Sequence, residues 1–463
     1  MSDDPFELAI EKVAPVPAEK TFFGQPPALA YLAFTEAWER FSFYGLNSLL
    51  VLYMSQWLLT PGHMQHIIGM HGLRAGLEQM FGRLTTLGLA SQIKGLYSGF
   101  VYFTPVLGGL IADRFTGRRA AVVAGALLMS AGHIAMAFDA SFLFALTLLI
   151  VGCGLLKGNI STQVGELYRE DDGEGRTRGF AIFSMAINFG AVGGPLLCGL
   201  LAQIWGWHAG FGLAGVLMLL ALATYLAGYR HLPKPSAAPK AAKAERVGGR
   251  SETTVVFGLF AIMALSVFQS VIYYQNTSIG LVWVDSHVDL NFLGFHVPVG
   301  WFGSIDPLTS ILCAPLLFVL WRWQHDRKHE PDEIGKIATG AFIATSANLI
   351  QALASLSGGR VSVLAPVAYD VLLGVGFLYY WPTMLALVSR AAPARLKATL
   401  VGSVFLSLLA ANLLIGWIGA LYETMGPTAF WGMQVAIGIV GGVMILLLRP
   451  TLNRLVLREQ ALA

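Results

Sequence analysis

Long apolar stretches separated by short polar segments run along most of the chain. A helix needs about 20 apolar residues to cross the hydrocarbon core of a bilayer. The pattern predicts twelve such segments, and we therefore expect an all-α membrane protein with twelve transmembrane helices. The segments lie near residues 27–57, 86–112, 119–138, 141–163, 177–204, 208–230, 253–284, 298–322, 336–357, 361–388, 397–424 and 428–449.

The one long polar interruption, residues 231–252, is rich in proline, alanine, lysine and arginine and is typical of a flexible basic linker. It divides the twelve segments into six and six, which is the layout of transporters built from two related halves. The predicted parts are a tail (1–26), an N-terminal bundle (27–230), the linker (231–252), a C-terminal bundle (253–450) and a second tail (451–463).

Composition agrees with this pattern. Of the 463 residues, 55% are hydrophobic and only 12% are charged, whereas a soluble domain has about 25% charged residues. The three cysteines all lie in apolar segments and indicate neither a disulfide framework nor a zinc site. The first twenty residues are rich in acidic side chains and have no compact apolar core, so we expect no cleavable signal peptide.

Lysine and arginine are distributed unevenly between the two sets of loops. If both tails are cytoplasmic, the loops and tails on that side hold 24 of the 30 Lys and Arg residues. The opposite loops hold three, and Arg40, Lys94 and Lys157 lie within or beside the apolar segments. The positive-inside rule then predicts a multi-pass protein of the cytoplasmic (inner) membrane with both termini in the cytoplasm.

Charged residues inside apolar segments are the main sign of function, because burying a charge in a membrane is costly. Glu36, Glu39 and Arg40 have the spacing i, i+3 and i+4, which places them on one helix face. Lys157 lies in the fourth segment with no carboxylate one turn away. Together the four charges sum to zero, so protonating one carboxylate frees one cation for another anion. The alternative is a buried salt bridge that only joins two helices, but such pairs seldom repay their desolvation.

At these residues the chain resembles proton-dependent oligopeptide transporters of the major facilitator superfamily. The first-helix motif is Glu36-x-x-Glu-Arg-Phe-Ser-Phe-Tyr-Gly. Further similar motifs are Gly95-Leu96-Tyr97 with Tyr102, the stretch Gly108 to Arg114, Gly154-Leu155-Leu156-Lys157-Gly158-Asn159, and Gly179 to Phe183 with Asn188. The stretch Gly109 to Arg119 is similar to the general facilitator loop between helices two and three, whose Asp113 and Arg114 are expected to act in conformational change.

The resemblance implies a role for each matching position. Glu36, Glu39 and Arg40 would form the proton-coupling cluster, and Lys157 would pair with this cluster or with a carboxylate of the substrate. Three polar side chains, Tyr44, Tyr102 and Asn188, would line a central cavity and bind the substrate. The alternative is that the tyrosines are ordinary packing aromatics and that Asn188 makes a hydrogen bond between helices.

The second half departs from the family pattern. Helix seven reads Val271-Ile272-Tyr273-Tyr274-Gln275-Asn276, without the usual acid, and the position of that acid's usual arginine partner is Asn47. The family's helix-ten glutamate, which is thought to receive the amino terminus of a peptide, falls on Phe377.

The expected substrate-binding side chains in this half are Tyr274, Gln275, Phe377 and Trp381. A wall with only hydroxyl groups and aromatic faces predicts stricter recognition of the substrate's carboxylate than of its amine. The alternative is that several of these rings serve in packing.

The predicted function is import of di- and tripeptides, or peptide-like amino-acid derivatives, with protons by alternating access. The alternatives are a proton-coupled carrier of another small organic anion or drug-like solute, and a nutrient sensor that does not transport. The chain has no His-Glu-x-x-His or Gly-x-Ser-x-Gly motif, so we expect no enzyme. We also expect no cofactor beyond protons, no metal at the loop histidines, no nucleic acid, and a monomer in the lipid bilayer.

Overall fold

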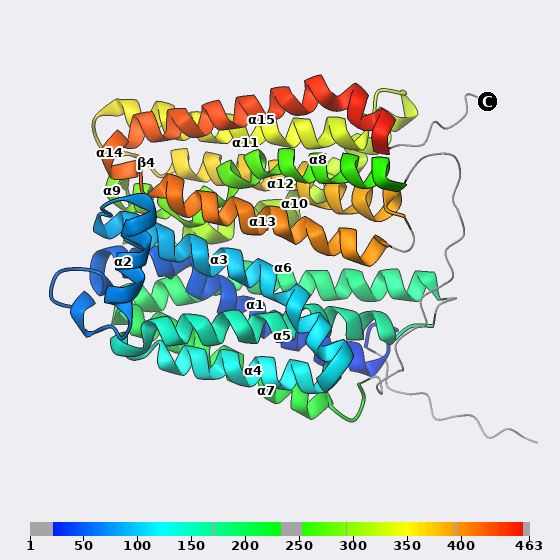
Figure 1. The fold of residues 1–463 in the computed structure, drawn as a ribbon, viewed down its shortest axis with the longest axis horizontal. Coiled ribbons are helices and arrows are strands. Elements are labelled where there is room, and N and C mark those ends of the chain that lie inside the picture. Colours follow the sequence, from blue (N-terminus) through cyan, green and yellow to red (C-terminus); the bar gives the residue numbers. More distant parts are fainter. Residues whose placement is uncertain (1–21, 170–171, 233–251, 293, 394–395, 457–463) are drawn as a thin grey trace, which may run out of the picture.

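The chain forms two bundles of roughly parallel long helices that lie side by side (Figure 1). The computed structural model describes residues 22–169, 172–232, 252–292, 294–393 and 396–456. Most of the linker predicted at 231–252 and most of both tails lie outside these residues. Twelve long helical spans in the described part correspond to the twelve predicted segments, so the predicted fold class is confirmed.

The N-terminal bundle contains six long helices. α1 packs against both α6 and α7, and α4 packs against α5. The long helices are α1 (Pro27–Tyr53), α3 (Thr86–Ile111), α4 (Arg118–Ala135), α5 (Phe142–Glu166), α6 (Gly173–Trp205) and α7 (Trp207–Gly228). Shorter elements are π-helical turns at Met54–Leu58 and Ala112–Thr116, 3-10 turns at Met64–His66 and Asp139–Ser141, and α2 (Met70–Phe81).

The C-terminal bundle repeats this arrangement. Its first span, the seventh of the chain, is broken near residue 276. α8 (Glu252–Tyr274) leads through a 3-10 turn, Gln275–Thr277, into α9 (Ile279–His287). The other helices are α10 (Ile305–Asp326), α11 (Glu333–Ala354), α12 (Leu364–Ala391), α13 (Lys397–Gly419), α14 (Tyr422–Met425) and α15 (Pro427–Val456), with 3-10 turns at Val299–Ser304 and Ser355–Ser357. α15 continues through Pro450, six residues beyond the predicted end of the bundle.

Four two-residue strands cover the end of the molecule that carries α2. β1 (Val288–Asp289) pairs in parallel with β4 (Val361–Ser362), and β2 (Asn291–Phe292) pairs antiparallel with β3 (Phe295–His296). These strands and α2 were not predicted, because short elements in polar loops leave no long apolar signature. They lie at the end opposite to the described chain ends near residues 22 and 456 (Figure 1).

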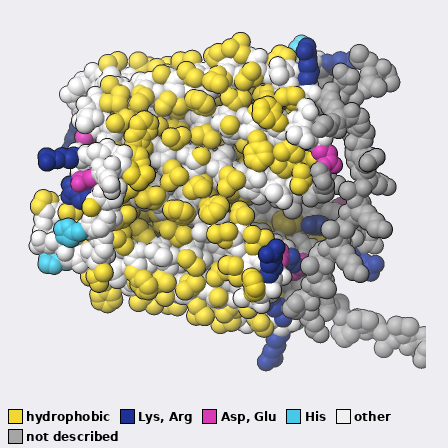
Figure 2. Space-filling model, in the orientation of Figure 1, with side chains coloured by type: hydrophobic (Ala, Val, Ile, Leu, Met, Phe, Trp, Pro, Cys, Tyr) yellow, Lys and Arg dark blue, Asp and Glu magenta, His cyan; other side chains and the backbone are white. Residues whose placement is uncertain are grey.

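The outer surface of the bundles matches the requirements of a membrane. Hydrophobic side chains cover the middle of the visible face, and charged side chains gather toward its two ends (Figure 2). In the described residues, ten helices are long and apolar enough to cross a bilayer. α1 and α4 are not among these ten, although they pack within the same bundle. α1 carries the three charges of the first-helix motif.

Contacts between the two bundles concentrate at the end that carries α2. A Cβ atom added at Gly95 of α3 would lie 2.8 Å from the Cα of Gly416 of α13, so these two helices meet backbone to backbone. Several hydrogen bonds between the bundles fall from mid-height toward this end. They include Ser304 Oγ to Val192 O at 2.7 Å, Trp301 Nε1 to Leu196 O at 2.8 Å, Gln203 Nε2 to His296 O at 2.9 Å, and Gln56 Nε2 to Asp285 Oδ2 at 2.7 Å.

Candidate functional site

The charged residues of the first-helix motif form one compact cluster on α1. The guanidinium of Arg40 binds both carboxylate oxygens of Glu39, and its Nε lies 3.1 Å from Glu36 Oε1. All three side chains are almost completely buried. The i, i+3 and i+4 spacing thus produces the arrangement that the sequence predicted.

Close packing of α6 encloses this cluster. A Cβ atom added at Gly190 would lie 2.7 Å from the Cβ of Arg40, so only a residue without a side chain lets the α6 backbone approach so closely. Glu39 is held by two bonds from Arg40, whereas Glu36 Oε2 is buried and has no described hydrogen-bond partner. The two carboxylates are therefore unequal, and Glu36 has an oxygen free to accept a proton.

Lys157 of α5 lies near the cluster without joining it. Its electrostatic interactions include Glu36, Glu39 and Arg40, but it forms no ion pair with a described carboxylate. The Nζ atom instead lies 5.0 Å from the centre of the Tyr102 ring, which is a cation–π contact. A partly buried ammonium group that contacts an aromatic ring and pairs with no described carboxylate is well suited to bind an external anion.

A row of aromatic rings connects this ammonium group to the C-terminal bundle. The ring centres of Tyr102 and Tyr274 lie 5.9 Å apart, and those of Tyr274 and Tyr273 lie 4.8 Å apart. Phe377 of α12 stacks on Tyr273 at 5.2 Å. The structure therefore brings together the predicted residues Lys157, Tyr102, Tyr274 and Phe377.

Sequence reasoning missed two buried acids in the C-terminal bundle. Asp306 of α10 and Asp370 of α12 are 8% and 3% exposed, and Asp306 Oδ2 accepts a hydrogen bond from Tyr273 Oη. The expectation that this half contributes only hydroxyl groups and aromatic faces is therefore wrong. The rule that singled out Glu36 and Lys157, an ionisable residue inside an apolar segment, would also have found these acids.

A cation absent from α1 is supplied by a neighbouring helix. Asn47 occupies the family's arginine position, and its backbone oxygen accepts a hydrogen bond of 2.9 Å from Lys94 Nζ of α3. The side-chain oxygen of Asn47 binds the same ammonium group. Lys94 forms no ion pair with a described carboxylate. Thus a positive charge stands beside position 47, and an acid stands beside Tyr273, although neither belongs to the expected helix.

The remaining predicted binding residues lie outside this row of ring contacts, although the phenol group of Tyr44 interacts electrostatically with Tyr102 and Asp306. Tyr44 is half-buried on α1, with its ring 5.2 Å from that of Phe43, and Asn188 is half-buried on α6. Gln275 is completely buried, and its amide has no described partner. Trp381 packs against Phe405 of α13 at 5.8 Å, apart from the row that contains Tyr273 and Tyr274.

Comparison with protein families identifies the group to which these features belong. Residues 119–248 and 241–430 match the family described as PTR2, POT family. The chain belongs to the POT family. It is therefore a multi-pass membrane transporter with the fold of its relatives, as the resemblance in the first-helix motif predicted.

The sequences of individual relatives align with this POT protein over nearly its full length. It is 30% identical to the di-/tripeptide transporter of Lactococcus lactis subsp. cremoris, with 94% of this chain and 98% of that protein covered. It is also 30% identical to the peptide transporter YePEPT of Yersinia enterocolitica, covering 94% and 96%. A crystal structure of a peptide transporter POT in complex with sulfate is 28% identical, with a TM-score of 0.80 and coverage of 94% and 97%.

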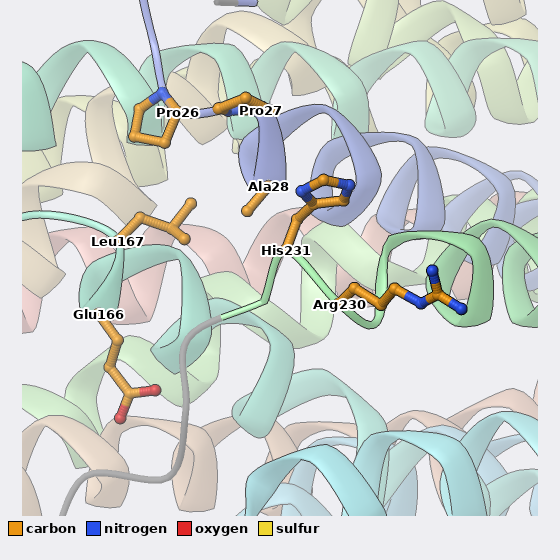
Figure 3. A pocket seen from close by; sticks show the side chains of 7 residues that line it. All are labelled: Pro26, Pro27, Ala28, Glu166, Leu167, Arg230 and His231. Atoms are coloured by element: carbon orange, nitrogen blue, oxygen red, sulfur yellow. The ribbon is translucent and has the colours of Figure 1, made fainter. Parts of the chain in front are cut away.

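A surface cavity of about 410 Å³ lies at the end of the molecule that carries the described chain ends near residues 22 and 456. Its lining includes Glu166 and Leu167 from the end of α5, together with Arg230 and His231 after α7 (Figure 3). Pro26, Pro27 and Ala28 complete the wall. None of the predicted proton-coupling or substrate-binding residues lines this cavity, so it is distinct from the central site.

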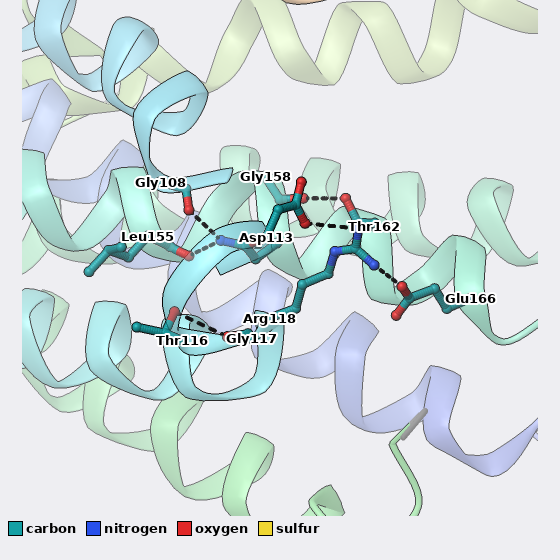
Figure 4. Close-up of polar contacts among 10 residues, drawn as sticks. Gly108, Asp113, Thr116, Gly117, Arg118, Leu155, Gly158, Thr162 and Glu166 are labelled. Carbon is teal, nitrogen blue, oxygen red and sulfur yellow. Dashed lines mark hydrogen bonds and ion pairs between the residues drawn. The ribbon is translucent and has the colours of Figure 1, made fainter. Parts of the chain in front are cut away.

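The loop between α3 and α4 holds the residues expected to act in conformational change. Asp113 Oδ1 lies 3.1 Å from Arg118 Nη2, and Arg118 also pairs with Glu166 at the end of α5 (Figure 4). Arg114 is exposed. The loop is thus fixed to α5 through Arg118, a residue that the sequence analysis did not select.

The loop histidines lie in the polar end of the molecule. His63 Nδ1 shares a hydrogen bond of 3.1 Å with the hydroxyl group of Thr60, and His296 Nδ1 donates one of 3.1 Å to Asn291 Oδ1. In the described residues, no group of three or more histidine, cysteine, aspartate or glutamate side chains is arranged to hold a metal ion.

Proposed function

We propose that this POT protein is a proton-coupled symporter that imports di- and tripeptides, or peptide-like amino-acid derivatives, by alternating access. The names of its Lactococcus and Yersinia relatives, which cover nearly the same length, support a peptide substrate. We infer that protons are the coupling ion. We also infer that a single chain is the working unit, because one chain contains both bundles.

One observation carries the proposal, namely the unequal pairing of the four charges around Arg40. With every group ionised, Glu36, Glu39, Arg40 and Lys157 have no net charge. A substrate carboxylate that binds Lys157 adds one negative charge, and a proton on Glu36 offsets it. Because net charge is costly inside a membrane, binding of the anion and binding of the proton favour each other.

The proton-accepting role falls on Glu36. Its Oε2 atom has no hydrogen-bond partner among the described residues, whereas protonating Glu39 would disrupt the two hydrogen bonds that Glu39 accepts from Arg40. Paired guanidinium and carboxylate groups in this geometry are strongly held. Glu39 then serves to keep Arg40 in place while Glu36 gains and loses its proton.

Contacts between the bundles indicate which side is closed. They gather at the end with α2, and the lysine and arginine distribution supports an orientation in which this end lies outside the cytoplasm. The arrangement fits a transporter closed toward the outside. Rocking of the two bundles about a central site is the usual motion in transporters of this layout.

Proteoliposomes test the proposal directly. Purified protein is reconstituted, and uptake of a radiolabelled dipeptide is measured with an inward proton gradient, without a gradient, and with a protonophore. We expect accumulation above equilibrium only with the gradient. Equal uptake in all three conditions would contradict proton coupling.

Two further measurements separate the remaining functions. If organic acids compete with the labelled solute but peptides do not, the protein carries another anion. If a peptide raises the thermal stability of the protein but no exchange occurs in counterflow, the protein is a sensor.

A further inference from the structure

Three glutamines inside the C-terminal bundle are completely buried, and their amides are unpaired. They are Gln275 at the break after α8, Gln351 of α11 and Gln434 of α15, and each is 0% exposed. Neither the oxygen nor the nitrogen of any of these amides has a hydrogen-bond partner among the described residues. Buried polar groups are nearly always hydrogen-bonded or bound to a ligand, so each of these amides requires an explanation.

Helix packing brings two of these amides to one level of the bundle. α8, α11 and α15 lie next to one another (Figure 1). A Cβ atom added at Gly438 of α15 would lie 2.8 Å from Ile272 Cδ1 of α8 and would also touch Thr345 Oγ1 of α11. Gln275 follows Ile272 by three residues, and Gln434 precedes Gly438 by four. Both therefore lie about one turn from this contact, on the same helix faces and toward the end with α2.

Asn348 connects α11 to the same level. Its Nδ2 donates a hydrogen bond of 3.3 Å to Ile272 O near the C-terminal end of α8, and its Oδ1 is buried without a described partner. Gln351 lies three residues further along α11, on the face that carries Asn348. Four amide oxygens from three neighbouring spans therefore lie around the end of α8.

Tyr369 of α12 adds a hydroxyl group on a fourth side. Its ring centre lies 5.7 Å from that of Trp431, which precedes Gln434 by about one turn. The Tyr369 hydroxyl is buried and has no described partner, and it interacts electrostatically with Asp370 and Asp306. The C-terminal end of a helix also carries a partial negative charge. The surroundings therefore favour a cation over an anion.

We propose that these amide oxygens bind a monovalent alkali cation, Na⁺ or K⁺, at the break between α8 and α9. Amide and carbonyl oxygens are hard ligands that suit such ions. Interrupted membrane helices of transporters also bind cations at the carbonyl groups that the interruption leaves free. The proposed ligands are all uncharged, which favours an ion of one charge over Mg²⁺ or Ca²⁺, since the sites for these divalent ions usually include carboxylates.

A cation at this place has two consequences for the bundle. It offsets one charge of Asp306 and Asp370, which form no ion pair with a described lysine, arginine or histidine. It also fixes the turn Gln275–Thr277, from which α9 leads to the contact between Asp285 and Gln56 of the other bundle. We therefore expect the ion to stabilise the closed end with α2. The inference goes beyond the proposed function, because it requires neither peptide nor a proton gradient.

Thermal unfolding of the purified full chain in detergent tests the inference without peptide. NaCl or KCl replaces choline chloride at constant ionic strength. In the wild type we expect the melting temperature to rise with the concentration of at least one alkali cation, as for a ligand that binds only the folded state. Equilibrium binding of radioactive sodium, or of rubidium as a substitute for potassium, should saturate at one ion per chain.

Gln351→Leu and Gln434→Leu should abolish both the shift and the binding. Leucine removes an amide that has no described partner, so the melting temperature in choline chloride should stay the same or rise. An amide that merely joined helices would lower it when removed. Gln269→Leu is the matched control, because Gln269 is also buried on α8 but lies on a different face from Gln275. It should keep the cation response.

Gln434→Glu serves if the leucine variants do not fold. It keeps an oxygen ligand at the same point and adds a negative charge, so the shift should occur at a lower cation concentration.

Three results would overturn the inference. The first is a wild type that melts at the same temperature in all three salts, which would show that the amides bind water only. The second is a folded leucine variant that keeps the cation shift, and the third is an unchanged cation titration in Gln434→Glu. Failure of peptide uptake in proteoliposomes would contradict the proposed function but leave the cation site standing.

Discussion

The two bundles share a fold but treat buried charge in opposite ways. In the N-terminal bundle, each cluster carboxylate lies beside Arg40, and Lys157 balances the remaining charge. In the C-terminal bundle, Asp306 and Asp370 have no described cation and only one described side-chain donor, Tyr273. The charges of the first arrangement sum to zero without a ligand, which suits it to exchange a proton. The second has no described cation that balances its carboxylates.

The largest effect is expected from removing the proton site. Glu36→Gln should lower the proton-driven accumulation of peptide by roughly 5–150-fold, the range expected for loss of thermodynamic coupling. It should leave counterflow of peptide intact. Glu39→Gln should impair counterflow as well, because it weakens the hold on Arg40. Initial rates of both modes in the same vesicles measure this difference. Normal accumulation by Glu36→Gln would break the proposed division between the bundles.

Loss of the free cation should be nearly as severe. Lys157→Ala should lower affinity for peptides with a free carboxylate by roughly thirtyfold or more, the usual effect of removing one partner of a buried charge pair. A peptide amide should lose little. Lys157→Arg should rescue poorly, because a planar guanidinium differs in shape and hydration from an ammonium group. Competition assays on folded protein provide the measurement, and equal losses for both peptides would argue for a structural role.

The contact between the bundles offers a third, intermediate effect. Gly95→Val would force α3 away from α13, at a cost of about 1–3 kcal/mol for overpacking. We expect the end with α2 to open more often, so that cysteines introduced at Gln56 and Asp285 form a disulfide less readily. Gly109→Val is the control on the same helix, because a Cβ atom at Gly109 contacts nothing within 4 Å. Identical crosslinking in both variants would show that Gly95 does not hold the bundles together.

The smallest effect concerns a carboxylate outside the membrane spans. Burial opposes ionisation of Asp332. Hydrogen bonds from Asn453, the Gly335 N–H and Arg449, together with the positive charge of Arg449, outweigh burial and lower the pKa of Asp332 below 3.8. Its stabilising contribution is therefore present above the unfolded pKa and is lost as the pH falls below it.

Asp332→Asn tests this contribution, because asparagine still caps α11 but cannot form the ion pair. The wild type should be more stable by roughly 0.5–1 kcal/mol at pH 7, and the difference should vanish as the pH is lowered from about 4 to 2. Melting temperatures in detergent at each pH provide the comparison. A difference that grows on acidification would reverse the sign of the linkage.

The sequence predicted the fold and the α1 cluster because both depend on local patterns. Apolar segment length defines the spans, and the spacing of Glu36, Glu39 and Arg40 places them on one face whatever the neighbouring helices are. Lys94 beside Asn47, and Asp306 beside Tyr273, depend instead on which helices pack together. A comparison made position by position with a family motif shows that a charge is missing but cannot show that another helix supplies it.

The most direct test of the account follows protons and peptide together. Vesicles loaded with a pH-sensitive dye report proton entry when peptide is added outside without an imposed gradient. We predict acidification in the wild type, no acidification in Glu36→Gln at equal peptide exchange, and wild-type proton entry per peptide in Asp306→Asn at saturating peptide. Peptide-driven acidification that persists in Glu36→Gln and disappears in Asp306→Asn would contradict the account, because the proton would then be carried by the C-terminal bundle.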